Sequence, residues 1–480
     1  TKQKFVKITA VWILYLGIFL PKLISFIISL GVYLAPVRVM ILSINVQQNN
    51  RHRSYNKKNT MSNQITLTID GQEITVPAGT TVMKACEAAG KEIPHFCYHD
   101  RLSVAGNCRM CLVEVEGAPK PVASCHWPVA EGMKVNTESE TTIEARKGTM
   151  EMLLINHPLD CPICDQGGEC ALQDQAVAYG SDRSRFIGQK RAVDDKEIGA
   201  KIKTVMTRCI HCTRCVRFAT EVAGVEEFGA TGRGAATEIG TYVENALQSE
   251  IAGNMIDLCP VGALTDKPYA FKARPWELVS TQGIDVMDGL GGHIHINSRA
   301  GQVMRTKPRE CEDINEEWMT DTARYSVDAL NHNRITAPMV KTNGKWTESN
   351  WPTVFEKIVK TLKGQSRERM AALASDLHSL EDYTAFTQFM KKTLKCDNID
   401  ARTDGSTITS ENPANYLLQL PIHEIENTDC VLLIGCNPRF EAPLVLTRLR
   451  KAIKQNGAEI FSIGDIGDIT LPYTSEWDNP

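Results

Sequence analysis

Residues 209 to 215 read Cys209-Ile210-His211-Cys212-Thr213-Arg214-Cys215. Three thiolates at this spacing can bind one face of an iron–sulfur cubane, and a Cys-Pro pair elsewhere in the chain can supply the fourth ligand. Cys259-Pro260 is such a pair. The stretch therefore predicts one [4Fe–4S] cluster, held by Cys209, Cys212, Cys215 and Cys259.

The triplet predicts a single cluster and not a pair. In two-cluster ferredoxins a fourth cysteine follows the triplet and serves the second cluster, whereas position 219 here holds Ala219. Three arginines that flank the triplet can offset the negative charge of a cluster: Arg208, Arg214 and Arg217. At least one of them is expected to be ordinary solvated surface.

A second cysteine group lies upstream, with the spacing C-x10-C-x2-C-x13-C. Plant-type [2Fe–2S] ferredoxins likewise combine one close C-x2-C pair with a cysteine before it and another after it. Gly106-Asn107 would let the backbone approach a cluster. The alternative is a zinc site, although structural zinc sites usually contain two close ligand pairs. The predicted [2Fe–2S] ligands are Cys97, Cys108, Cys111 and Cys125.

A third group has the spacing H-x3-C-x2-C-x5-C. A helix predicted over Thr142–Asn156 should stop before Pro158, because proline disfavours the helical conformation of the residue preceding it. His157 would then stand at the helix end and face a loop that offers only three thiolates. The alternative is that His157 is a bystander, and the group taken alone is also compatible with zinc. The predicted [4Fe–4S] ligands are His157, Cys161, Cys164 and Cys170.

The count of ligands supports three clusters. Eleven of the 16 cysteines and His157 make three complete sets of four. Cys86 is left over and falls on one helix face with Val82 and Ala89, so it is assigned to core packing. The remaining cysteines have no mutual ligand spacing and are expected to be free thiols: Cys311, Cys396, Cys430 and Cys436.

The composition is that of an ordinary globular protein. At 480 residues the chain should form about three to four domains. Its net charge of −4 gives no general footprint for nucleic acid. No G-x-G-x-x-G motif has the strand and helix context of a dinucleotide site, so we expect this chain to bind neither NAD nor flavin.

The first 60 residues differ from the rest. They carry nine Lys or Arg and no Asp or Glu. Two apolar runs, Val11–Leu20 and Leu23–Val37, are separated by Pro21-Lys22, and each is shorter than the roughly 20 residues of a membrane span. Two interpretations remain open: residues 1–60 form a membrane anchor, or they are not part of the natural protein and translation begins at Met61.

Hydrophobic patterns predict a multi-domain chain that is α+β first and α/β later. Alternating residues on both sides of Asp70-Gly71 indicate a hairpin, and a short helix ending at Gly90 should follow; together with the cysteine loop this is compatible with a β-grasp ferredoxin. Residues 112–115 should be a strand, and a second hairpin should turn at Ala300-Gly301. Further on, strands at 370–373, 431–434 and 460–463 with a helix over 444–455 indicate a parallel sheet, which we expect to be incomplete at the end of the chain.

Several longer stretches resemble one known family. They are Pro94-His95-Phe96-Cys97-Tyr98-His99, Ala105–Val115, Asn156–Cys170, Arg208–Arg217, Glu312–Trp318 and Asn437–Pro443. All of them resemble the large iron–sulfur subunit of respiratory NADH:quinone oxidoreductase, complex I, in its α-proteobacterial and mitochondrial branch. The resemblance runs from Met61 to about Ile463 and leaves residues 1–60 without a counterpart.

The resemblance implies an electron-transfer subunit. Such a subunit holds one [2Fe–2S] and two [4Fe–4S] clusters, one of them ligated by histidine, and passes electrons from a flavin subunit toward quinone. Its partners would be the flavin- and iron–sulfur-containing NADH dehydrogenase subunits and other subunits of complex I. It would lie peripherally on the cytoplasmic side of the bacterial inner membrane, or on the matrix side in mitochondria. The C-terminal half would resemble molybdopterin oxidoreductases without holding a molybdenum cofactor.

We expect six segments. They are an apolar and basic extension (1–60), a [2Fe–2S] β-grasp ferredoxin domain (61–138), a [4Fe–4S] segment with one histidine and three cysteine ligands (139–180), a [4Fe–4S] ferredoxin-like domain (181–274), a cluster-free start of the molybdopterin-oxidoreductase-like region (275–332) and an incomplete α/β domain (333–480). Some relatives carry a further cluster in the fifth segment, but no cysteine lies between Cys259 and Cys311.

Two other interpretations remain. An iron-only hydrogenase or an NAD-linked formate dehydrogenase subunit would share the N-terminal clusters, but each would need additional cysteines that the sequence lacks. A structural zinc protein is a different class, and analysis for acid-labile sulfide separates it because zinc sites contain none.

Overall fold

A computed structural model describes residues 64–241, 246–330, 332–401, 412 and 416–475, together with the two-residue strand β1 (Leu42–Ser43). The predicted apolar runs of the first 60 residues lie outside these described residues. Within the described part of the chain, no helix is both long and apolar enough to cross a membrane.

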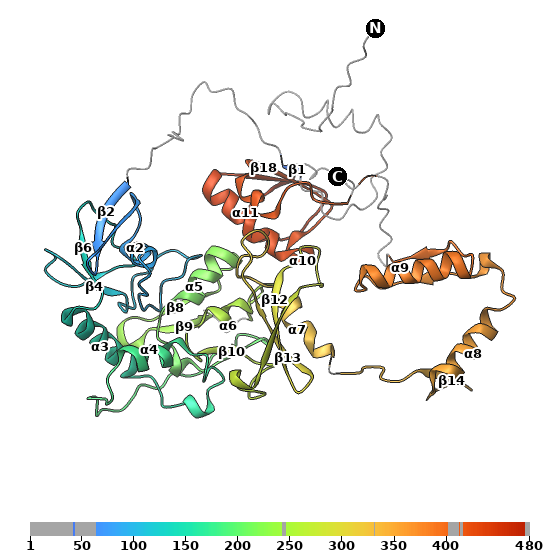
Figure 1. Ribbon diagram of the computed structural model, residues 1–480, viewed down its shortest axis with the longest axis horizontal. Coiled ribbons are helices and arrows are strands. Elements are labelled where there is room, and N and C mark those ends of the chain that lie inside the picture. Colours follow the sequence, from blue (N-terminus) through green and yellow to red (C-terminus); the bar gives the residue numbers. More distant parts are fainter. Residues whose placement is uncertain are drawn as a thin grey trace, which may run out of the picture.

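The first unit is a five-stranded mixed sheet with one helix (Figure 1). Its strand order is β3 (Gln72–Pro77), β2 (Gln64–Ile69), β6 (Lys134–Asn136), β4 (Leu112–Val115) and β5 (Val122–Ala123). The predicted hairpin is confirmed, since Ile69 pairs with Gln72 across the Asp70-Gly71 turn. Helix α2 (Val82–Ala88) begins at the Thr81 cap and buries Met83 and Cys86 against the sheet, so the assignment of Cys86 to the core is also confirmed.

Two helices follow the sheet, α3 (Glu140–Leu154) and α4 (Ala171–Tyr179). The predicted helix before Pro158 is confirmed, and its apolar Ile143 is exposed. The buried stripe is Thr142, Arg146 and Met150, each four residues after the last. Arg146 can occupy the stripe because its Nε donates to the Leu112 carbonyl at 3.1 Å.

The next unit is built from short elements around one core. Strand β7 (Ile202–Thr204) pairs with β10 (Leu264–Asp266), and β8 (Phe228–Thr231) pairs with β9 (Glu238–Thr241), both antiparallel. Helices α5 (Arg214–Phe218) and α6 (Asn254–Leu258) pack between them. Phe218 and Met255 are fully buried. These elements frame the loop that holds the cysteine triplet.

A three-stranded antiparallel sheet comes next: β11 (Val279–Ile284), β12 (His293–Arg299) and β13 (Gln302–Pro308), followed by α7 (Asp321–Tyr325). The predicted hairpin at Ala300-Gly301 is confirmed. Strand β11 was not predicted. Val279 and Ile284 at its two ends are both exposed, so it lacks the alternation that marks a half-buried strand.

The last unit contains the predicted parallel arrangement. Strands β18 (Cys430–Ile434) and β19 (Glu459–Ile463) are parallel and joined through α10 (Pro438–Glu441) and α11 (Pro443–Asn456). Gly457 ends α11 with φ +69°, close to the predicted end of the helix at residue 455. The sheet order is β1-β18-β19-β20, with β20 at Thr474–Ser475.

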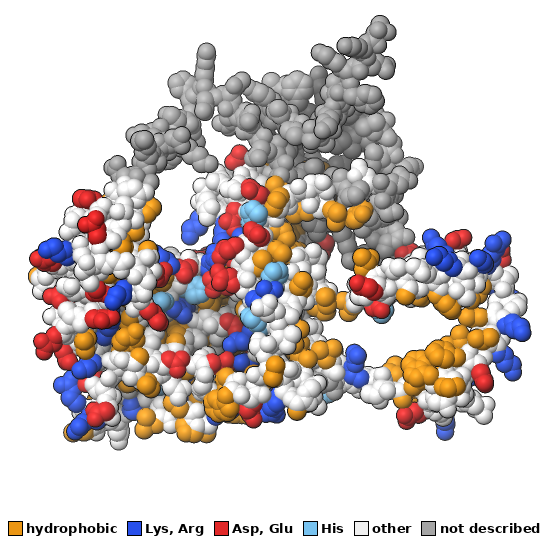
Figure 2. All heavy atoms as spheres, in the orientation of Figure 1, with side chains coloured by type: hydrophobic (Ala, Val, Ile, Leu, Met, Phe, Trp, Pro, Cys, Tyr) orange, Lys and Arg blue, Asp and Glu red, His pale blue; other side chains and the backbone are white. Residues whose placement is uncertain are grey.

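An intervening segment lies to one side of this body in Figure 1. It contains β14 (Met339–Thr342), β15 (Lys345–Glu348), α8 (Trp351–Leu362), β16 (Ala372–Leu373), α9 (Leu380–Gln388) and β17 (Ile399–Asp400). The predicted strand at 370–373 is therefore shorter than expected. Helix α8 buries no residue, and Figure 2 shows apolar side chains gathered over it.

Candidate metal centres

The first cysteine set is brought together at the edge of the five-stranded sheet. All four side chains are buried: Cys97, Cys108, Cys111 and Cys125. The backbone N–H of Cys97 donates to Cys108 Sγ at 3.4 Å. The thiols of Cys97 and Cys111 both make hydrogen bonds to Cys125, and this bond lowers the pKa of Cys111 to about 7. The thiols thus face one another.

Left-handed backbone shapes the loop of this set. Gly106 has φ +61° and Arg109 has φ +60° on either side of Cys108. Glycine adopts this conformation without strain, whereas a side chain such as that of Arg109 does so rarely. The winding exposes successive backbone groups to the thiols, and N–H donors of this kind tune iron–sulfur clusters.

The triplet set lines one small cavity. Cys209, Cys212, Cys215 and Cys259 share its wall with Met206, Ile239 and Leu264. Cys259 follows the end of α6, while Cys215 lies in the first turn of α5. Burial raises the pKa of the Cys259 thiol to about 12. A thiol in such a setting stays protonated unless a nearby positive charge, such as a bound metal, compensates the thiolate.

The His157 set is the most open of the three. Cys164 and Cys170 are buried, whereas Cys161 is exposed. His157 Nδ1 is buried and has no hydrogen-bond partner among the described residues. Burial, together with the charges of Lys190 and Arg208, lowers the pKa of His157 to about 4. The imidazole is therefore neutral near pH 7, which is the form that ligates metals.

The residues present fit iron–sulfur clusters in their donor chemistry. Buried thiols face one another in the first set and share a cavity in the triplet set, and an unpartnered imidazole nitrogen accompanies the third. A site for a single metal ion is a different arrangement. In the described part of the chain, no three His, Cys, Asp or Glu side chains are arranged to hold one.

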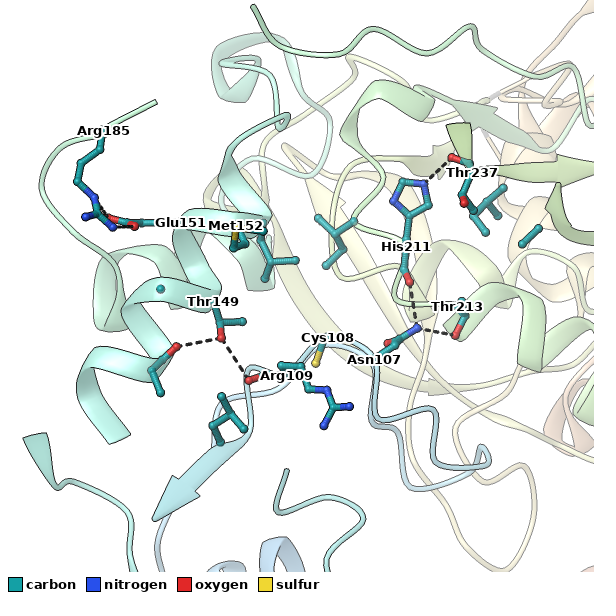
Figure 3. A pocket seen from close by; sticks show the side chains of 17 residues that line it. Asn107, Cys108, Arg109, Thr149, Glu151, Met152, Arg185, His211, Thr213 and Thr237 are labelled. Carbon is teal, nitrogen blue, oxygen red and sulfur yellow. Dashed lines mark hydrogen bonds and ion pairs between the residues drawn. The ribbon is translucent and has the colours of Figure 1, made fainter. Parts of the chain in front are cut away.

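The triplet set lies between the other two. On one side, Asn107 Nδ2 donates to the His211 carbonyl at 3.2 Å, which joins the first set to the triplet loop (Figure 3). On the other side, Cys170 Sγ lies 3.7 Å from the carbonyl oxygen of Pro260, next to Cys259. The three sets therefore form a row.

Figure 3 views a pocket beside this junction. It opens between the Asn107–Leu112 loop, helix α3 and the β8–β9 hairpin. Thr149 of α3 donates to the Arg109 carbonyl at 3.5 Å, and His211 Nε2 lies 3.1 Å from the Thr237 carbonyl. These contacts fix the walls around Cys108.

Two residues important to the His157 set were not found from the sequence. Arg274 Nη1 donates to the Cys164 carbonyl at 2.6 Å, from 110 positions away. Gly262 lies against the same cysteine, because a Cβ built on it would stand 2.1 Å from Cys164 Sγ. No local signal could have revealed Arg274, whereas the glycine just after Cys259-Pro260 is itself a local signal of close packing.

Five protein-family models match the chain in succession. They are a 2Fe-2S iron-sulfur cluster binding domain (residues 62–140), the NADH-ubiquinone oxidoreductase-G iron-sulfur binding region (146–185), the ferredoxin-like domain of NADH-quinone oxidoreductase subunit 3 (199–265), the NDSU1/NuoG-like 4Fe-4S domain of NADH-ubiquinone oxidoreductase (278–328) and molybdopterin oxidoreductase (334–478). The predicted order of a 2Fe-2S domain, 4Fe-4S domains and a molybdopterin-oxidoreductase-like region is confirmed.

Two relatives match most of the chain. The NADH-ubiquinone oxidoreductase 75 kDa subunit of Reclinomonas americana is 49% identical over 425 residues, which covers 86% of this chain and 61% of the relative. A subunit of the NADH-quinone oxidoreductase of Rickettsia bellii is 50% identical over 401 residues, which covers 84% of this chain and 59% of the relative. This chain is a relative of the 75 kDa subunit of NADH-ubiquinone oxidoreductase. The predicted resemblance is confirmed, and the chain spans about 60% of the length of these relatives.

A solved structure is also similar. A chain of the NAD+-reducing [NiFe]-hydrogenase in the H2-reduced state is 32% identical, with a TM-score of 0.40, and the match covers 44% of this chain and 90% of that one.

The match to the NDSU1/NuoG-like 4Fe-4S domain includes a single cysteine, Cys311. The backbone of Cys311 pairs with that of Glu316.

Proposed function

We propose that this relative of the 75 kDa subunit is an electron-transfer subunit of NADH:quinone oxidoreductase. It holds one [2Fe–2S] cluster on Cys97, Cys108, Cys111 and Cys125. One [4Fe–4S] cluster is held by His157, Cys161, Cys164 and Cys170, and a second by Cys209, Cys212, Cys215 and Cys259. The observation that carries the proposal is the row of three ligand sets, joined by direct contacts on both sides of the triplet set.

When bound, the clusters accept and release single electrons. The residues of this chain hold them in sequence and shield them. Asn107 fastens the first loop to the triplet loop, and Cys170 meets the segment after Cys259. With clusters bound, this row of residues would hold them close enough to relay electrons from a flavin-containing NADH dehydrogenase subunit toward quinone.

The domain boundaries that we propose are those predicted from the sequence. Residues 61–138 form a β-grasp ferredoxin domain, 139–180 the segment with one histidine and three cysteine ligands, and 181–274 a ferredoxin-like domain. Residues 275–332 and 333–480 form a molybdopterin-oxidoreductase-like region that holds no molybdenum and supports the cluster domains. The subunit works with other complex I subunits, peripherally on the cytoplasmic or matrix side of the inner membrane.

Metal and sulfide analysis tests the proposal. The full chain, purified without oxygen, should contain about ten irons with an equal amount of acid-labile sulfide, from one binuclear and two cubane clusters. Electron paramagnetic resonance of the reduced protein should resolve one [2Fe–2S] and two [4Fe–4S] signals. Stoichiometric zinc without labile sulfide would contradict the proposal and favour a structural zinc protein.

A further inference from the structure

Two arginines of α5 lie at the junction between the first cysteine set and the triplet set. Arg217 Nη2 donates to the Cys97 carbonyl at 2.5 Å and to the Cys212 carbonyl at 3.2 Å. Its Nη1 donates to the Ser103 carbonyl. Arg214 Nη2 donates to the Tyr98 carbonyl at 2.5 Å. One guanidinium therefore binds backbone next to proposed ligands of two different clusters.

Neither arginine has an ion pair with a carboxylate among the described residues, in contrast to its neighbours. Arg208 Nη2 lies 2.9 Å from Asp160 Oδ2, and Arg101 Nε lies 3.2 Å from Glu317 Oε1. The Nε atoms of Arg214 and Arg217 are buried without a hydrogen-bond partner. Both side chains are half-buried, and a cation partly removed from water is destabilised unless an opposite charge compensates it.

The available negative charge is that of the cysteines. Arg217 binds the carbonyls of Cys97 and Cys212, and Arg214 binds the carbonyl of Tyr98, next to Cys97, so the two guanidinium groups lie beside ligands of both sets. Thiolates ligating iron would therefore supply the counter-charge that the carboxylates do not provide.

We propose that Arg217, assisted by Arg214, is a positioning residue shared by two clusters: it clamps the Cys97 loop onto the Cys212 loop and stabilises the reduced state of both sites. The inference rests on the proposed function. Reduction adds one electron, and hence one negative charge, to a cluster. A cation held between the two sites favours that charge at either of them, since net charge and hydrogen bonding set cluster potentials. The three carbonyl contacts fix the separation across which the electron passes.

Redox titration of the full chain, followed by electron paramagnetic resonance, tests this inference. Arg217→Gln removes the charge and should lower the potentials of both the [2Fe–2S] and the four-cysteine [4Fe–4S] cluster. A tenfold change in each reduction equilibrium corresponds to about 59 mV for one electron. The His157-ligated cluster should keep its potential. Arg185→Gln is the control, because Arg185 is an exposed arginine paired with Glu151, and it should shift none of the three.

Arg217→Lys separates charge from position. Lysine keeps the cation but lacks the fork that bonds several carbonyls at once. This variant should nearly preserve both potentials while weakening the magnetic interaction between the two reduced clusters. Arg214→Gln should shift both potentials in the same direction as Arg217→Gln, by less.

The outcomes are distinct. A wild-type chain without these clusters would contradict the proposed function itself. Clusters present, with neither or only one potential moved by Arg217→Gln, would overturn the shared role. If Arg217→Gln loses a cluster, the other two variants decide: unchanged magnetic interaction in Arg217→Lys and unchanged potentials in Arg214→Gln would overturn it equally.

Discussion

Single residues determine how closely the cluster loops can approach. Gly262 shows this most clearly, because its Cα hydrogen occupies the space where a Cβ would meet Cys164 Sγ at 2.1 Å and Gln166 Cβ at 3.2 Å. The spacing of the cysteines is the basis of the proposed ligand sets, since spacing is a local property of the sequence. It could not predict Arg274 or the loop that Gly262 meets, because both contacts depend on distant parts of the chain.

Gly262→Ala should damage the His157 site and spare the others. The added methyl must displace Cys164, and overpacking of this kind costs about 1–3 kcal/mol. We expect loss or broadening of one [4Fe–4S] signal in the paramagnetic resonance spectrum, with the other two intact. Gly229→Ala is the control, since nothing lies within 4 Å of the added Cβ there. An unchanged spectrum in Gly262→Ala would contradict the packing argument.

His157→Ala should also affect only one of the two [4Fe–4S] signals. The imidazole is a neutral ligand where a thiolate is anionic, so its removal should change the potential or the occupancy of that cluster alone. His295→Ala is the control: His295 lies on β12 and its Nδ1 is 3.3 Å from the Ser280 hydroxyl. If His157→Ala changed neither signal, His157 would be a bystander and another ligand would hold the fourth iron.

At the scale of elements, alternation and turn chemistry predicted the β2–β3 hairpin, the β12–β13 hairpin and the β18–α11–β19 unit. Strands β2, β18 and β19 bury alternate residues, so their pattern can be recognised in the sequence. Strand β11 escaped prediction because its ends are exposed, and the buried face of α3 has no apolar pattern because it includes Thr142 and Arg146. An arginine can be buried when its guanidinium donates to a backbone carbonyl, as Arg146 does to Leu112. The sequence alone does not indicate that such an arginine is buried.

Asp70 at the first turn should make the N-terminal sheet sensitive to acid. Burial alone would raise the pKa of its carboxyl, but hydrogen bonds from Thr137 and Lys91 outweigh burial and hold the pKa below 3.8. The Thr137 N–H donates to Asp70 Oδ1 at 2.7 Å, which ties the turn to the chain after β6. A carboxyl with a lowered pKa stabilises the fold above pH 3.8, and this stability is lost as the pH falls through the folded-state pKa.

Asp70→Asn tests this directly, because asparagine tolerates the φ of +48° at this position. Near neutral pH, urea denaturation should give the variant a free energy of unfolding about 1.5 kcal/mol lower than that of the wild type. The difference from wild type should shrink below pH 3.8. Asp182→Asn, at an exposed aspartate, should show no difference at any pH. A difference for Asp70→Asn that stays constant from about pH 7 to about pH 3 would contradict the argument.

At the scale of the whole molecule, the C-terminal α/β unit is fastened to the cluster region by arginines. Arg439 Nε lies 2.9 Å from Glu250 Oε2, and Arg450 Nε donates to the Val222 carbonyl at 3.2 Å. Leu444 of α11 joins the same hydrophobic core as Phe218 and Cys259. The sequence predicted the α/β unit but not this attachment, which depends on pairs of residues about 190 to 230 positions apart. The unit therefore braces the domain that carries the proposed clusters.

The same organisation leads to a prediction about how the whole chain exchanges electrons. The sequence contains ligand sets for clusters but no dinucleotide fingerprint, so NADH should reduce the chain only through a flavoprotein partner. The test mixes the full chain with NADH and follows bleaching of the clusters in visible light. Dithionite serves as the control that the clusters are reducible. We expect slow bleaching with NADH alone and fast bleaching once the flavin-containing NADH dehydrogenase subunit is added. A row of cluster sites can only relay electrons that another site has removed from a substrate. Rapid reduction without the flavin-containing subunit, or oxidation of formate or hydrogen by the chain alone, would therefore show that the chain contains a catalytic centre of its own.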